Sequence, residues 1–238
     1  MRDQYVGDVT DVLKYALLRT LVGDDLTLGV AWYYVPKNDG RPDGRHREWR
    51  EQEGWKSLDA EVYDALSSDE LRTVEAVMAA PFWPRGTVFD STAVPQSNGR
   101  KSWADTVVAK LSGQRVVFLD PDTGVGEPSE RHVSLTELAA FHATGATVVF
   151  ISFPERRRHD LLVEELHQLV LRQTKCATVA TLRTTVRVPY GIPLTGWVPR
   201  ARWFTIVEPG EVLSERLKAF NDKLGTVPYV RAQLCEGG

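Results

Sequence analysis

The feature of this sequence that most constrains its fold is an alternation of short apolar runs with amphipathic segments. The runs at 26–35, 87–90, 115–120, 147–153, 178–188 and 203–207 have the length and residue types of strands. Segments with helical periodicity, beginning near Ser102, Ser134, Glu155 and Glu211, separate most of them. Such an alternation is typical of a mainly parallel sheet covered by helices. We therefore predict an α/β fold in which ligands bind beyond the carboxyl ends of the strands.

Two further segments complete the predicted architecture. Apolar residues at helical spacing predict an amphipathic helix from Asp11 to its end at Gly23. The charged stretch 48–80 predicts a helical insertion, with Ser68-Asp69-Glu70 as a start signal and Pro81 as a stop. Since no linker or repeat divides the chain, we expect one domain over 1–238.

Composition excludes several classes of protein. Hydrophobic residues make up 42% and charged residues 26%, which is typical of a globular chain. The net charge of −3 gives no overall positive field for nucleic acid or membranes, so any basic surface is local. Two cysteines make no disulfide framework, and no stretch reads as a signal peptide or membrane span. We expect a cytoplasmic protein.

The apolar run 116–119 ends in Asp120-Pro121-Asp122-Thr123-Gly124, which we interpret as a candidate site. Pro121 biases Asp120 toward an extended conformation at the strand tip, and Gly124 permits a tight turn. A carboxylate placed there can accept a hydrogen bond from an amino group, bind a hard metal or act as a base. Asp120 and Asp122 are therefore the candidate catalytic residues, and the alternative is that the motif is only a turn.

Polar residues also follow two other predicted strands. The loop after the first strand contains Asn38 and Asp39, which suit close approach to a nucleotide-type ligand. A helix start at 155–159 presents Arg156, Arg157 and Arg158, candidates for binding a substrate phosphate. Four later arginines extend this local basic character: Arg183, Arg187, Arg200 and Arg202.

Two motifs carry a resemblance to a known family. Asp11-Val12-Leu13-Lys14 resembles part of the Asn-His-Ala-Asp-Val-Leu-Lys-His segment of the bacterial 23S rRNA adenine-N6 methyltransferases. Phe118-Leu119-Asp120-Pro121 lies where that family has an apolar strand followed by its catalytic Asp-Pro-Pro-Tyr. The correspondence extends weakly over most of the chain. This sequence has Asp122 in place of the second proline and Thr123 in place of the aromatic residue that stacks on the target base.

The resemblance implies a Rossmann-like methyltransferase fold and S-adenosylmethionine as cofactor. It implies that Lys14, Tyr15, Asn38 and Asp39 bind the cofactor. It also implies that Asp120 orients the acceptor amine of a nucleobase, free or in nucleic acid.

Two alternatives stay open at the level of the sequence. In a metal-dependent nuclease or phosphodiesterase, Asp120 and Asp122 would hold a divalent ion, with Asp39 and His46 as further possible ligands. No ligand spacing typical of a metal site supports that interpretation. A non-catalytic nucleotide-binding module would keep the fold without the chemistry.

Overall fold

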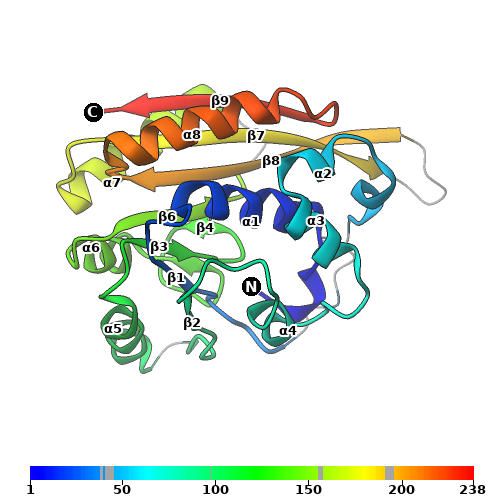
Figure 1. Ribbon diagram of the computed structural model, residues 1–238. Coiled ribbons are helices and arrows are strands. Elements are labelled where there is room, and N and C mark those ends of the chain that lie inside the picture. The colour runs from blue at the N-terminus through cyan, green and yellow to red at the C-terminus, as the bar shows by residue number, and fades with distance from the viewer. Residues whose placement is uncertain (38–39, 41–45, 97, 155–157, 191–195) are drawn as a thin grey trace.

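The described part of the chain folds around a seven-stranded sheet, shown in the computed structural model of Figure 1. The structure describes residues 1–37, 40, 46–96, 98–154, 158–190 and 196–238, without the side chains of 189, 190, 196 and 197. The strands are β1 (Leu28–Ala31), β2 (Val88–Asp90), β3 (Val116–Leu119), β6 (Thr147–Ser152), β7 (Val179–Tyr190), β8 (Gly196–Val207) and β9 (Val230–Gly237).

The sheet has a parallel half and an antiparallel half. Across it the strands are ordered β2-β1-β3-β6-β8-β7-β9. The first four pair in parallel, and each later neighbour pairs antiparallel to the one before it. Five of the seven strands (β2, β1, β3, β6 and β7) therefore point the same way. This confirms the predicted α/β fold with a mainly parallel sheet.

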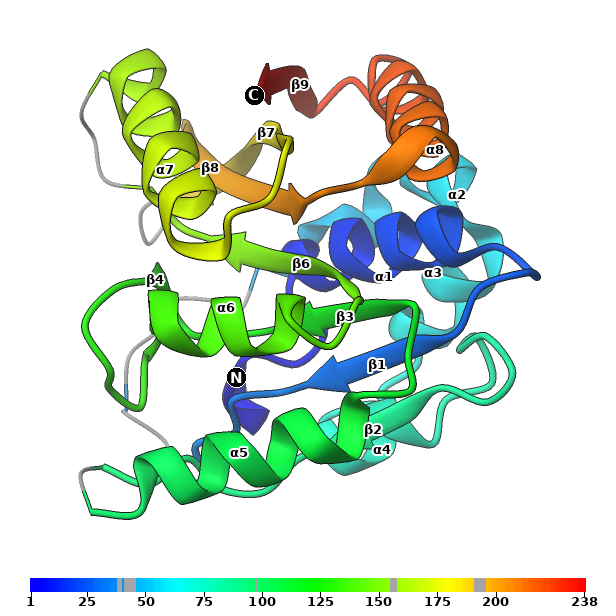
Figure 2. The same cartoon turned by 90° about the vertical axis from the view of Figure 1, so that its left-hand side faces the viewer.

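Helices cover both faces of the sheet (Figure 2). One face carries α1 (Val9–Val22) and α8 (Gly210–Leu224), and the other carries α5 (Arg100–Leu111), α6 (Leu135–His142) and α7 (His159–Thr174). Both layers form hydrophobic cores against the sheet. Every residue of β1 and β3 is buried, because parallel strands between two helical layers have no face in water.

Helix α1 is buried on almost every side rather than along one amphipathic face. The Asp8 side chain caps its start by accepting a hydrogen bond from the Thr10 backbone, and Gly23, at φ +56°, ends it. All of its residues except Arg19 and Thr20 are buried. Two of its charged residues, Asp11 and Lys14, are therefore in the protein interior, where they require partners.

Among the described residues between β1 and β2, the chain forms four short helices. They are a 3-10 turn (Glu48–Glu51), α2 (Trp55–Leu58), α3 (Ala60–Ser67) and α4 (Val74–Met78), and they join the core that contains α1. The predicted start signal at Ser68 was wrong, because Ser68 follows the end of α3. Helix α4 instead begins after Thr73, whose hydroxyl accepts from the Ala76 backbone. A capping residue favours a helix end locally, and packing decides which of two nearby candidates is used.

Several strands and helices begin or end at residues other than those predicted. The strand predicted at 26–35 shortens to β1, because the backbone turns at Tyr33, where φ is +45°. Strand β8 starts at 196 rather than 203, and α7 starts at His159 rather than Glu155. Strand β9 was not predicted. The remaining short elements are a 3-10 turn (Asp3–Tyr5), β4 (Gly124–Val125) and β5 (His132–Val133). None of the described helices has the length and apolar character needed to cross a membrane.

Candidate functional site

The sheet contains a topological switch at β1. The chain places β2 on one side of β1 and β3 on the other, and in open α/β sheets ligands bind beyond the carboxyl ends of the strands near such a point. A cavity of about 260 Å³ lies where the residues after β3 and β6 meet the first turns of α1. Its lining includes Asp8, Asp11 and Lys14 from the start of α1, and Asp120, Pro121 and Asp122 from the end of β3.

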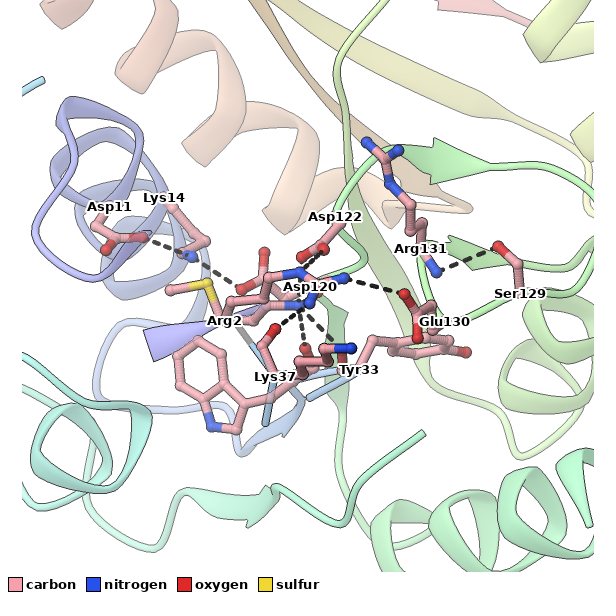
Figure 3. A network of polar contacts seen from close by, with 12 residues as sticks. Arg2, Asp11, Lys14, Tyr33, Lys37, Asp120, Asp122, Ser129, Glu130 and Arg131 are labelled. Atoms are coloured by element: carbon pink, nitrogen blue, oxygen red, sulfur yellow. Dashed lines mark hydrogen bonds and ion pairs between the residues drawn. The ribbon is translucent and has the colours of Figure 1, made fainter. Parts of the chain in front are cut away.

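Lys14 forms the centre of a buried ionic cluster (Figure 3). Its side chain is 2% exposed, and Nζ lies 2.7 Å from Asp11 Oδ1 and 2.9 Å from Asp120 Oδ2. The rings of Tyr15 and Trp32 lie 4.9 and 5.4 Å from the same atom. Burial lowers the pKa of Lys14, but the two carboxylates outweigh burial and raise it above its ordinary value. Lys14 is therefore a permanent ammonium.

Asp11 holds Lys14 in position. Its Oδ1 contacts the ammonium, and its Oδ2 accepts a 2.8 Å hydrogen bond from the Gly7 backbone. Burial raises the pKa of Asp11, and the neighbouring Lys14 opposes that rise. Removing the ammonium would therefore leave two carboxylates facing each other inside the protein.

Asp120 occupies the tip of β3, and one of its oxygens remains available. Its backbone N–H donates to Ala31 O at 3.0 Å, which continues the pairing of β3 with β1 and fixes the main chain. Oδ2 accepts from Lys14 at 2.9 Å. Oδ1 has no hydrogen-bond or ion-pair partner among the described residues, although Asp120 as a whole is 4% exposed. The cavity beside it is the place where a ligand can supply that partner.

Asp122 is already paired with cations from the first two residues. Arg2 Nε donates to its Oδ2 at 2.9 Å, and the same guanidinium contacts Glu130 and the Lys37 carbonyl. The Met1 ammonium lies 2.9 Å from Oδ1 as an ion pair, without the alignment of a hydrogen bond. Asp122 therefore fixes this corner of the site electrostatically.

Backbone carbonyls at the switch point form a corner suited to an ammonium group. The oxygens of Trp32, Tyr33 and Asp120 accept from the Met1 ammonium at 3.1, 3.0 and 3.2 Å. Together with the Asp122 carboxylate, the corner offers acceptors and no donor. The Met1 ammonium fills this set of acceptors in the structure.

An aromatic side chain and a buried guanidinium form another wall of the cavity. Phe153 follows β6, and Arg202 belongs to β8. The Arg202 guanidinium carbon lies 4.9 Å from the centre of the Phe153 ring, and its Nε donates to Thr10 Oγ1 at 2.7 Å. Thr10 in turn donates to Asp8 Oδ1 at 2.6 Å, which ties the start of α1 to β8.

Only some of the predicted site residues line the cavity. The structure brings Lys14, Asp120 and Asp122 together around one cavity. Tyr15 does not line it, because its ring is fully buried against Trp32 and other aromatic side chains. Arg158 is an exposed residue immediately before α7 and does not line the cavity. The other predicted residues, Asn38, Asp39, Arg156 and Arg157, lie outside the described residues.

The described side chains do not form a group suited to hold a divalent metal. No group of three or more His, Cys, Asp or Glu side chains suited to a metal occurs in the part of the chain that the structure describes. Asp120 and Asp122 each pair with a protein cation instead. Of the other two possible ligands, Asp39 lies outside the described residues, and His46 does not line the cavity.

Sequence reasoning missed three of the residues that build the site, Asp11, Phe153 and Arg2, and named Arg202 only as part of a basic surface. Asp11 had a readable signal, because it precedes Lys14 by three residues on one helix and so shares its face. Phe153 had a weaker one, since it follows a strand as Asp120 does. Arg2 had none, and the contact of Arg202 with Thr10 had none, because Arg2 and Asp122 are 120 residues apart and Thr10 and Arg202 are 192 residues apart in the sequence.

Comparisons with known proteins give only distant structural likeness. No protein-family model and no curated protein matches the sequence. A Legionella pneumophila protein of the family model DUF519 is similar in structure, with 13% identity over 98% of each chain and a TM-score of 0.46. A SAM-dependent methyltransferase from Agrobacterium tumefaciens is similar with 12% identity and a TM-score of 0.41, over 83% of this chain and 60% of the other. Neither likeness assigns a function to this chain.

Proposed function

We propose that this protein is an S-adenosylmethionine-dependent methyltransferase that acts on an exocyclic amino group of a nucleobase, free or within a nucleic acid. The observation that carries the proposal is the Asp120 carboxylate at the tip of β3. One of its oxygens is held by Lys14, and the other has no partner among the described residues beside a cavity. An immobile acceptor at the edge of a ligand cavity suits the recognition of an N–H donor.

The residues of the chain can then be assigned roles. Asp120 Oδ1 accepts one N–H of the amine, and the carbonyl of Pro121 accepts the other, so the nitrogen lone pair is directed away from both. Lys14 holds the carboxylate in position through its hydrogen bond to Oδ2. When bound, the cofactor supplies an electrophilic methyl group on a sulfonium sulfur. The Asp120 carboxylate then receives or relays the proton that the methylated nitrogen releases.

The carboxylates near the cavity also suit the charge of the cofactor. Asp11 and Asp120 share a single ammonium, so this cluster carries one negative charge. A sulfonium cation is stabilised by such a field in a partly desolvated site.

The metal-dependent alternative receives less support from the same residues. A divalent ion held by both aspartates would face the Lys14 ammonium on Asp120 and would compete with Arg2 for Asp122, and both cations are at most 5% exposed. Breaking either buried pair costs several kcal/mol, on the order of 3–5. Amine recognition needs no such rearrangement at Asp120.

Isothermal titration calorimetry with S-adenosylmethionine and S-adenosylhomocysteine tests the proposal. We expect saturable binding of both, and no saturation up to millimolar ligand would refute it. Transfer of a radioactive methyl group from the cofactor to bulk RNA, DNA and nucleosides then tests the acceptor class. A control variant, Lys101→Met, alters an ammonium that is 89% exposed and should leave both measurements unchanged.

A further inference from the structure

Phe153 is fixed at the level of the Asp120 motif by the parallel pairing of β3 with β6. Leu119 is opposite Phe150 in that pairing, so a continuation of the register places Asp122 opposite Phe153. The Phe153 N–H donates to the Thr123 carbonyl at 2.9 Å, which joins the two strand ends.

The close approach of these two segments depends on Gly124. A Cβ at this position would lie 2.9 Å from the Ser152 hydroxyl oxygen and 3.1 Å from its Cα. Because glycine has no side chain, the turn after Asp120 can lie directly against the end of β6. Phe153 is therefore a neighbour of the strand tip and lines the same cavity as Asp120 and Pro121.

The ring of Phe153 is held in place from one side. Arg202 is 9% exposed, its guanidinium carbon lies 4.9 Å from the ring centre, and it donates to Thr10 and to the Ala201 carbonyl. The guanidinium is therefore held by polar contacts while it lies over the ring as a cation–π partner. A half-buried aromatic ring that is anchored in this way and lines a cavity loses little entropy when a flat ligand stacks on it.

Position 123 cannot supply such a ring. It is Thr123, whose hydroxyl oxygen is buried without a hydrogen-bond partner among the described residues, and it does not line the cavity. If the substrate is a nucleobase, the platform for its π-face must come from another element.

We propose that Phe153, supported by Arg202, is the platform on which the substrate base stacks while its amine contacts Asp120. This inference rests on the proposed function and assigns the base-binding wall of the same site to the end of β6. Stacking recognises any planar base, so Phe153 contributes affinity, and the amine acceptors at Asp120 select for an amino-bearing base.

The test uses 2-aminopurine riboside, whose fluorescence is quenched when the base stacks, titrated with the full-length protein in the absence of cofactor. For Phe153→Leu we expect affinity to fall about 5- to 150-fold, which corresponds to a stacking free energy of roughly 1–3 kcal/mol. Phe153→Trp should retain most of the affinity because it keeps a π-face. The matched control is Phe89→Leu, since Phe89 is also partly buried but packs on Trp83 and Trp32 outside the cavity.

Circular dichroism verifies that each variant is folded, and Phe153→Met, which keeps the apolar volume, replaces Phe153→Leu if the latter does not fold. The inference is overturned if the wild type shows no saturable quenching, if loss of the ring leaves affinity unchanged, or if the Phe89 control weakens binding equally. Calorimetry with S-adenosylmethionine on the same proteins separates the two proposals. Failure of the wild type to bind cofactor rejects the proposed function, while the stacking result is read independently of it.

Discussion

Replacing Lys14 by methionine is expected to lower the free energy of unfolding by about 3–5 kcal/mol at neutral pH, because it removes one partner of a buried ion pair. Methionine keeps most of the apolar stem, so lost packing is a small part of the effect. The main cost is that the Asp11 and Asp120 carboxylates, 3% and 5% exposed, lose the ammonium between them. At roughly 2–4 °C per kcal/mol for a chain of this size, the melting temperature should fall by about 6–20 °C.

The pH dependence of this loss identifies its cause. Burial already raises the pKa of Asp11, and without Lys14 only the hydrogen bond from the Gly7 backbone opposes that rise. When the pKa of a carboxyl group is raised in the folded state, the protein loses stability as the pH rises through that pKa and regains it as the pH falls. The deficit of Lys14→Met should therefore shrink toward mildly acidic pH. On the alkaline side the deficit should persist at pH 10, because the folded pKa of Lys14 is raised above its ordinary value and the ammonium keeps its charge there.

Urea unfolding followed by circular dichroism at pH 5, 7 and 10 measures these differences. Lys101→Met is the control, because Lys101 and its partner Asp105 are 89% and 60% exposed and their pair should contribute less than about 1 kcal/mol. A loss below about 1 kcal/mol for Lys14→Met at pH 7, or a deficit that does not change with pH, would contradict the assigned role of the cluster.

Three further variants test other parts of the structure. Asp120→Asn keeps the shape of the strand tip and leaves Asp11 as the counter-ion of Lys14, so it should cost only about 1 kcal/mol in urea unfolding. It should reduce methyl transfer roughly a hundredfold or more, and full activity would remove Asp120 from the site. Gly124→Ala places a Cβ against Ser152 at a φ of +134°, so we expect a loss of about 1–3 kcal/mol, and an unchanged melting temperature would contradict it. Burial lowers the pKa of His167, which is hydrogen-bonded to Thr181 at 2.8 Å, so stability should fall as pH drops below about 6.5. His167→Gln should reduce this fall in stability at acidic pH. An unaltered pH dependence would show that other groups cause it.

Local chemistry in the sequence was enough to predict the fold class and the position of the main candidate site. Strand-length apolar runs predicted β2, β3 and β6 to within a residue or two. Ser134 was a correct helix start, since its hydroxyl and the Glu137 side chain form a reciprocal cap, and Gly23 was a correct helix end. Asp120 was placed at a strand tip because Pro121 and the preceding strand act on it through adjacent residues. These features depend on hydrogen bonds and dihedral angles within a few residues of each other.

The partners of the site residues were decided by tertiary structure alone. Lys14 and Asp120 are 106 residues apart, and they meet because α1 packs against the sheet at the tip of β3. Phe153 lies beside the Asp120 motif because β6 pairs with β3, and Arg202 supports its ring because β8 pairs with β6. Periodicity in a sequence specifies which face of an element is apolar, but strand order and helix docking specify which elements share a cavity. The ionisation of Lys14 and the free oxygen of Asp120 depend on that packing, since burial and neighbouring charges exist only once the chain has folded.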